Sequence, residues 1–146
     1  RASEVLSLSW LNIKDRHMRI IGKGNKERIV PICDELLSIL DEWYSRQQAF
    51  LNEQPSLVVS NEDGSAVSGS FFRRMVKNVL MSCGCPYDLA HPHALRHSFA
   101  TKMAAMGLSL LSLQKILGHS SLNTTQVYVN LADSFTSSEF FNLTSI

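Results

Sequence analysis

Two side chains that could bind one phosphate together lie in the segment His93-Ala94-Leu95-Arg96. On a helix, residues three positions apart share a face, so the imidazole of His93 and the guanidinium of Arg96 could reach the same anion. Arginine holds an oxyanion through two fixed hydrogen bonds, and histidine can donate a hydrogen bond or carry a proton. The same pair is also typical of an ordinary helix surface or cap, so this pattern alone leaves the function open.

Three histidines in the same segment, His91, His93 and His97, raise the alternative of a metal site. His93 and His97 have the i, i+4 spacing of paired ligands. The segment contains no Asp or Glu, however, and the chain has no CxxC pair. A metal site is therefore the less favoured interpretation of these histidines.

Another imidazole, that of His119, directly follows Gly118 in the segment Leu117-Gly118-His119. Glycine commonly ends a helix in a left-handed turn, which would hold His119 in a defined position. The alternative is a histidine that interacts only with the dipole of the helix C-terminus. Tyr128 lies nine residues further on, and a single tyrosine among apolar neighbours is most often a core residue with a satisfied hydroxyl.

The segment Gly22-Lys23-Gly24-Asn25-Lys26 predicts a tight, exposed hairpin that presents two lysines, because glycine readily adopts positive φ. It lacks the spacing of a phosphate-binding P-loop, and no helix follows it at once. Without further information, its simplest interpretation is a solvated hairpin tip.

The elements that must position these residues can be predicted from periodicity and turn residues. Alternating runs near the N-terminus indicate a small antiparallel meander, and the rest of the chain is mostly helical in pattern. Asp34 is the expected N-cap of the second helix, and Ser68 or Ser70 that of the third. The expected helices cover about 1–8, 34–51, 68–83, 92–107, 109–117 and 122–132, and the expected strands 10–13, 17–21, 28–31 and a short separate one at 57–59.

The composition fits one globular domain or the larger part of one. The chain has 146 residues, 45% of them hydrophobic, and no apolar run approaches the ~20 residues that span a bilayer. The formal net charge is only +1, so nucleic-acid binding would require clustered basic residues. Three cysteines, an odd number, favour a reducing environment. Because the first residues already have a helical pattern and no initiator methionine, we expect a piece of a longer protein.

The motifs occur in one order: Arg1-x-Ser3-Glu4, Gly22-Lys23-Gly24-Asn25-Lys26-Glu27-Arg28-x-Val30-Pro31, His93-x-Leu95-Arg96-His97, Leu117-Gly118-His119 and Tyr128. In this order and spacing the sequence resembles the tyrosine recombinases, also called phage integrases. The resemblance covers most of the chain. It is strongest toward bacterial Xer-type and integrative-element enzymes.

The resemblance implies a site-specific recombinase or integrase that cleaves and rejoins DNA strands without a metal ion or nucleotide. Tyr128 would attack the scissile phosphate, form a 3′-phosphotyrosine and release a 5′-hydroxyl. Arg1 and Arg96 would hold the non-bridging oxygens, because two guanidiniums can stabilise the charge of a pentacoordinate phosphate.

The remaining catalytic roles also come from the resemblance. Lys23 would protonate the leaving 5′-oxygen from a mobile hairpin. His93 would assist proton transfer at the tyrosine, and His119 would donate to a phosphate oxygen. Glu4 is expected to be a structural partner of the polar groups near Arg1.

Double-stranded DNA is the partner that the resemblance implies, bound by a homotetramer that is a monomer in isolation, away from any membrane. The expected location is the cytoplasm, at the nucleoid. Since the net charge is small, the basic residues must share one face. The candidate DNA-binding residues are Lys26, Arg28, Arg73, Arg74 and Lys77.

The implied fold is α+β and mainly α-helical, the catalytic-domain fold of this family, with a three-stranded antiparallel sheet near the N-terminus. We expect the catalytic domain at residues 1–132, truncated at its N-terminus. A tail or short helix at 133–146 would contact a neighbouring protomer or its own domain. Two alternatives stay open: a type IB topoisomerase that relaxes DNA, and a catalytically inactive integrase fragment that only binds DNA.

Overall fold

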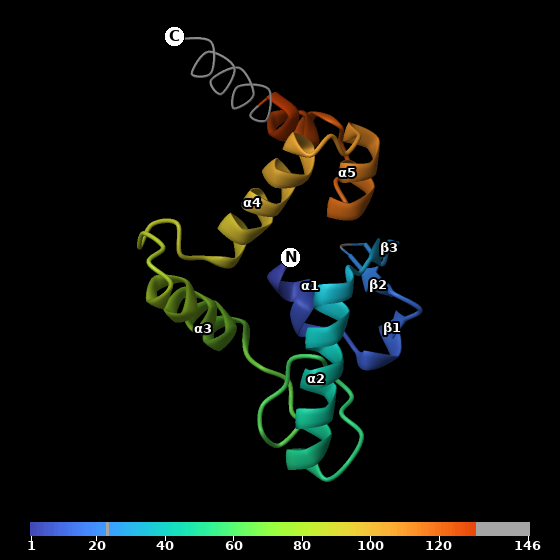
Figure 1. The fold of residues 1–146 in the computed structure, drawn as a ribbon, viewed down its shortest axis with the longest axis vertical. Helices are drawn as coiled ribbons and strands as arrows, with labels where there is room; N and C mark the ends of the chain where they lie inside the picture. The colour runs from blue at the N-terminus through green and yellow to red at the C-terminus, as the bar shows by residue number, and fades with distance from the viewer. Residues whose placement is uncertain (23, 131–146) are drawn as a thin grey trace. The chain divides into compact units, whose positions relative to one another are not determined.

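The computed structural model describes residues 1–22 and 24–130. The backbone divides into two compact units, Arg1–Pro92 and His93–Ile146. In Figure 1 the first unit is coloured from blue to yellow-green, and the second begins in yellow with helix α4 (Pro92–Ala105). None of the helices in the described part of the chain has the length and apolar content of a transmembrane span.

The first unit combines a small sheet with helices. Its strands follow the order β1-β2-β3, and antiparallel pairs such as Met18↔Val30 set the register of β2 against β3. The predicted three-stranded antiparallel sheet near the N-terminus is therefore confirmed. The elements of this unit are α1 (Ala2–Leu6), a 3₁₀ turn η1 (Trp10–Asn12), β1 (Ile13–Lys14), β2 (His17–Ile21), β3 (Glu27–Pro31), α2 (Asp34–Leu51) and α3 (Gly69–Ser82).

The core of the first unit forms where the sheet packs against α2. Ile20 of β2 and Leu40 of α2 are buried together with Leu8, Ile32 and Val58. These apolar residues come from segments far apart in the sequence, so their burial fixes the sheet and α2 as one body. The strands that carry the β2–β3 hairpin are therefore held in place by this core.

The first strand is shorter than predicted. The hydroxyl of Ser9 accepts a hydrogen bond from the backbone N–H of Leu11, which starts the turn η1. Residues 10–12 therefore form a turn, and only Ile13–Lys14 remain for β1. The prediction of a strand over 10–13 was wrong for its first three residues, because the serine cap competes with the strand ladder.

The separate strand predicted at 57–59 is absent from the described structure, where Leu57 forms only an isolated bridge with Ser9. The reason is Gln47, which is 0% exposed and donates from Nε2 to the carbonyl of Leu57 at 3.3 Å. The same amide donates to Ser60 Oγ at 3.0 Å and accepts from Trp10 Nε1 at 2.8 Å. The buried amide of Gln47 thus hydrogen-bonds the Leu57 carbonyl, which a neighbouring strand would otherwise need as an acceptor.

Two helix starts test the capping predictions. Cys33, in extended backbone, is the N-cap of α2, so the expected cap Asp34 is instead the first helical residue and forms an ion pair with Arg16. At α3, Ser68 is the cap, since its hydroxyl accepts a hydrogen bond from the N–H of Phe71 at 3.2 Å.

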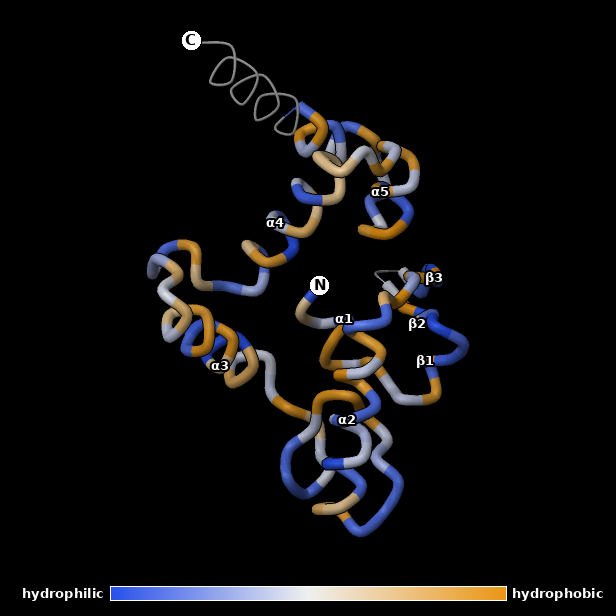
Figure 2. Tube along the Cα trace, in the orientation of Figure 1, coloured by the Kyte–Doolittle hydropathy of each residue, from blue (hydrophilic) through white to orange (hydrophobic). Residues whose placement is uncertain are grey.

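Figure 2 shows hydrophobic and hydrophilic residues alternating along α3, as in an amphipathic helix.

The second unit is helical throughout most of its described length. It contains α4 (Pro92–Ala105), α5 (Leu110–Leu117) and a helix at 123–130. Ser109 caps the start of α5 and Gly118 ends it in the left-handed conformation, so the predicted helices at 92–107 and 109–117 are confirmed within two residues. The last residues of the helix predicted at 122–132, and the tail predicted at 133–146, lie outside the described residues.

Candidate active site

Tyr128 lies at the centre of the second unit. It is 4% exposed and packs in one core cluster with Ala100 of α4 and with Leu113 and Leu117 of α5. Burial of this ring ties the helix at 123–130 to both preceding helices. The position of the tyrosine hydroxyl is therefore set by the core and not by a mobile loop.

The hydroxyl of Tyr128 meets an imidazole. Its oxygen lies 2.8 Å from Nδ1 of His97, within hydrogen-bond distance, and the two rings are 5.4 Å apart. The ring of His93, one helical turn earlier on α4, packs edge-on against His97 with centroids 4.4 Å apart. A phenol and two histidines thus lie in a continuous row.

His119 approaches Tyr128 as a third imidazole. Their rings are stacked with an interplanar angle of 19° and centroids 6.2 Å apart. The left-handed backbone of Gly118 (φ 65°) turns the chain so that the N–H of His119 bonds back to the carbonyl of Gln114 at 3.2 Å. Nδ1 of His119 lies 2.9 Å from the hydroxyl of buried Thr125. The predicted glycine turn therefore holds this histidine in a defined position.

Arg96 joins the same group of residues. One of its Nη2 hydrogens is donated to the carbonyl of Leu117, the last residue of α5. This bond anchors the guanidinium next to the Gly118 turn that carries His119. The structure therefore brings four predicted site residues together in the second unit: His93, Arg96, His119 and Tyr128.

In the first unit, Glu4 links the predicted residue Arg1 to Arg28. Glu4 is 7% exposed, and its two carboxylate oxygens accept from Nη1 and Nη2 of Arg28 at 3.0 and 2.7 Å. Arg1 Nη1 donates to the same carboxylate at 2.8 Å. The expected role of Glu4 as a structural partner beside Arg1 is confirmed.

The electrostatics of this carboxylate follow from its partners. Burial raises the pKa of Glu4, but the hydrogen bonds from Arg28 and Arg1 outweigh it and lower the pKa to about 2. Glu4 is therefore ionised at neutral pH and holds both guanidiniums. The side chain of Arg1 stays 38% exposed, so it remains accessible to an anion.

A cleft of about 490 Å³ opens beside these groups. Arg1 and Glu4 line it, and so does Gly22, where the β2–β3 hairpin begins. Positive φ angles at Gly24 and Asn25 produce the predicted tight turn, and Lys26 is exposed on it. Lys23 itself lies outside the described residues.

Three of the predicted DNA-binding residues lie on α3. Arg73 and Arg74 are exposed, and the guanidinium of Arg74 lies 5.5 Å from the ring centre of Phe71. Lys77 Nζ lies 3.1 Å from the ring centre of Tyr87 and lowers the pKa of that phenol by hydrogen bonding. Arg28 differs from these residues, because its side chain is only 15% exposed and is engaged by Glu4.

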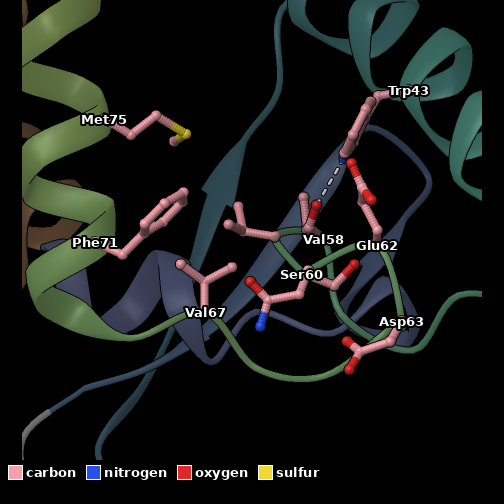
Figure 3. Close-up of a pocket in the computed structure, with 10 residues that line it drawn as sticks. Trp43, Val58, Ser60, Glu62, Asp63, Val67, Phe71 and Met75 are labelled. Carbon is pink, nitrogen blue, oxygen red and sulfur yellow. Dashed lines mark hydrogen bonds between the residues drawn. The ribbon is translucent and has the colours of Figure 1, made fainter.

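A larger pocket, of about 820 Å³, lies in the first unit (Figure 3). Its walls are mostly apolar, with Trp43 from α2 and Phe71 and Met75 from α3, and Glu62 and Asp63 lie on the loop beside it. None of the predicted catalytic residues that the structure describes lines it. Size alone therefore does not identify the candidate site in this protein.

Two site residues were not predicted from the sequence. His97 was predicted only as a candidate metal ligand and as part of a family motif, although its nitrogen contacts the Tyr128 hydroxyl, and Thr125 was given no role. Thr125 and Tyr128 are three positions apart on one helix, and this spacing could have indicated that Thr125 lies near the site. No group of three potential ligands close enough for a metal ion occurs among residues 1–22 and 24–130.

Comparison with known proteins defines the class to which this fold and site belong. The family model described as "Phage integrase family" matches residues 1–134. Tyrosine recombinase XerC of Haemophilus ducreyi is 40% identical over 129 residues, which are 86% of this chain and 41% of that protein. Tyrosine recombinase XerD of Proteus mirabilis is 35% identical over 136 residues, 90% of this chain and 44% of that protein.

Solved structures agree with this relationship. The crystal structure of XerA recombinase matches with a TM-score of 0.80 and 25% identity, over 100% of this chain and 54% of that one. XerH site-specific recombinase bound to palindromic difH substrate matches with a TM-score of 0.79 and 28% identity, over 95% of this chain and 40% of that one. The chain belongs to the phage integrase family, the tyrosine recombinases. It spans only 41% to 46% of the length of its curated relatives.

Proposed function

We propose that this chain carries out site-specific DNA strand cleavage and rejoining, as a recombinase or integrase, through a 3′-phosphotyrosine at Tyr128. The observation that carries the proposal is the hydroxyl of Tyr128, held 2.8 Å from an imidazole nitrogen in a unit that also contains His93, Arg96 and His119. A weakly acidic hydroxyl needs a base within hydrogen-bond distance to become a nucleophile. Membership of the recombinase family supports the same chemistry.

The phosphate would be held by guanidiniums. Arg96 and Arg1 would bind the non-bridging oxygens and stabilise the additional negative charge of the transition state. The anchoring of each arginine supports these roles, because Arg96 is fixed by the carbonyl of Leu117 and Arg1 by the carboxylate of Glu4. For Arg28 the same geometry supports a role in positioning Arg1 through Glu4.

Protons would be moved by three further side chains. Lys23, on the β2–β3 hairpin, would protonate the leaving 5′-oxygen, and His93 would assist proton transfer near the tyrosine. His119 would donate to a phosphate oxygen. With Nδ1 of His119 engaged by Thr125, the nitrogen that can make this donation is Nε2.

We propose double-stranded DNA as the substrate, bound by a homotetramer at the nucleoid. The solved relative XerH, bound to its difH substrate, supports DNA as the partner. The cations of this chain that would contact phosphates are Lys26, Arg73, Arg74 and Lys77. Lys26 and the two arginines are exposed, and Lys77 is partly exposed. Residues 1–132 would serve as the catalytic domain.

The alternatives are not favoured by the comparisons. The relatives found are recombinases and integrases, which disfavours a type IB topoisomerase. An inactive fragment that only binds DNA would form no covalent product, so the same experiment tests it.

The test is a search for a covalent protein–DNA adduct. The full-length protein is mixed with nicked duplexes drawn from its own genomic neighbourhood, and products are separated on a denaturing gel. The chain has three tyrosines, so Tyr44→Phe and Tyr87→Phe are the controls within it for Tyr128→Phe. We expect an adduct from the wild type and both controls but not from Tyr128→Phe. DNA binding without an adduct in any protein would contradict the proposal and favour the binding-only alternative.

A further inference from the structure

The imidazole nitrogen next to the Tyr128 hydroxyl belongs to His97, to which no specific catalytic step has been assigned above. Oη of Tyr128 lies 2.8 Å from His97 Nδ1. Tyr128 is 4% exposed, whereas His97 is exposed. The imidazole of His97 therefore connects a buried hydroxyl with solvent.

The neighbouring histidines are engaged in other ways. His119 is stacked face to face on Tyr128, and its Nδ1 is bonded to Thr125. His93 packs with its ring edge-on against His97, one turn earlier on α4. His97 is the imidazole whose nitrogen the structure places at Tyr128 Oη.

We propose that His97 Nδ1 accepts the proton of Tyr128 Oη when the tyrosine attacks a DNA phosphate; this assignment rests on the proposed function. The Oη–H bond breaks and its proton goes to Nδ1, while Oη forms a bond with phosphorus. The bond between phosphorus and the 5′-oxygen breaks, and the leaving oxygen takes a proton from Lys23. In the reverse step His97 returns its proton to the departing tyrosine, so atoms and charges balance in both directions.

The proposal predicts a dependence on pH. A protonated imidazole cannot accept a proton, so cleavage should fall as the pH is lowered. The titratable groups next to this pair are His93 on α4, whose ring packs against His97, and His119 after α5, whose ring is stacked on Tyr128. Arg96 lies on the same helix as His97 and donates to the carbonyl of Leu117. Titration of His93 and His119 would also alter the profile, so the test compares variants of His97 with the wild type.

Two substitutions separate proton transfer from positioning. In His97→Asn the amide oxygen can still accept a hydrogen bond from Tyr128, but an amide cannot take up the proton at any pH at which the protein stays folded. His97→Phe keeps an aromatic ring and removes the hydrogen bond. His91→Asn, an exposed histidine near the start of the same helix, is the matched control.

The rate of adduct formation is measured in a single turnover of the full-length proteins on the nicked duplex, after DNA affinity and circular dichroism have shown that each variant folds and binds. We expect both His97 variants to react at least about 100-fold more slowly than the wild type, as for the loss of a general base. The fall in rate at low pH should be weaker in His97→Asn. His91→Asn should behave as the wild type.

A duplex with sulfur in place of the bridging 5′-oxygen adds a second readout, because a thiolate leaves without a proton. This duplex should restore cleavage by Lys23→Ala but not by His97→Asn. Equal rates for wild type and His97→Asn, faster cleavage by either variant, or rescue of His97→Asn by the sulfur duplex would each overturn the assignment. Absence of an adduct in the wild type would instead refute the proposed function, so the two failures are distinguishable.

Discussion

Thr125 Oγ1 lies 2.9 Å from Nδ1 of His119, so a fully buried hydroxyl fixes the orientation of a half-buried imidazole. Thr125 is on the same helix as Tyr128, one turn earlier. The helix at 123–130 thus supplies both the tyrosine and the group that orients the histidine stacked on it. Any change at Thr125 should act on cleavage through His119.

Replacing Thr125 with valine keeps the shape of the side chain and removes the hydroxyl. We expect cleavage by Thr125→Val to slow by about tenfold or more, the size of effect seen when a partner that orients a functional histidine is removed. Thermal unfolding should show a loss of about 1 kcal/mol for the missing hydrogen bond. Thr125→Ser, which keeps the hydroxyl, should cleave at nearly the wild-type rate; an equally slow serine variant would show that packing, and not the bond, matters here.

Gly118 provides a second test of how His119 is positioned. Its φ of 65° is left-handed, a conformation that costs an alanine about 1–2 kcal/mol. Gly118→Ala should therefore lower both the stability and the cleavage rate, while Gly118→Asn should be milder because asparagine tolerates this region.

The matched control is Gly84→Ala, at a glycine with φ 82° and no atoms within 4 Å of an added Cβ. We expect a similar loss of stability there without a loss of cleavage by the folded protein. Urea unfolding and single-turnover cleavage measure the two effects. Equal cleavage by both alanine variants, after correction for the folded fraction, would argue against a special role of the Gly118 turn.

Features predicted correctly from the sequence are those with local causes. Ser68, Ser109 and Gly118 mark helix ends through their own backbone and hydroxyl groups, and these ends occur where the sequence indicated them. Alternation within β2 and β3 likewise predicted the sheet. Such signals need only the neighbouring residues.

Features that depend on distant partners were not predictable in the same way. Leu57 had the residue types of a strand, but its carbonyl accepts a hydrogen bond from the side chain of Gln47 on α2. Arg28 has the charge of a DNA-binding residue, yet burial against Glu4, 24 positions away, engages its guanidinium. The contact between Tyr128 and His97 spans 31 positions, and only the packed helices bring it about.

The carboxylate of Glu4 predicts a specific dependence of stability on pH. Its pKa in the folded protein is about 2, against an ordinary value of 4.5, so the unfolded chain binds more protons between these values. Glu4 therefore contributes stability above about pH 4.5, and this contribution is lost as the pH falls toward 2. The shift corresponds to an upper bound of about 3–4 kcal/mol, which solvent screening reduces.

Urea unfolding of the wild type and of Glu4→Gln at several pH values measures this contribution. We expect Glu4→Gln to be less stable near neutral pH and to lose less stability on acidification. Glu53→Gln, at an exposed position, is the control and should follow the wild type. A wild-type profile that is parallel to that of Glu4→Gln would contradict the assignment of the acid sensitivity to this carboxylate.

The basic residues of α3 can be tested through the salt dependence of DNA binding. If Arg74 contacts a phosphate, its replacement by alanine removes one released counterion, and the slope of log K against log salt should become shallower by about 0.9. Arg46→Ala on α2 is the matched control, because Arg46 is also exposed and is paired with Glu42 in a surface ion pair. We expect no change of slope for Arg46→Ala. Arg28→Ala should slow cleavage but leave the salt slope nearly unchanged, since the Arg28 guanidinium is engaged by Glu4. A slope that becomes shallower by the full amount of about 0.9 in Arg28→Ala would show that Arg28 contacts DNA directly.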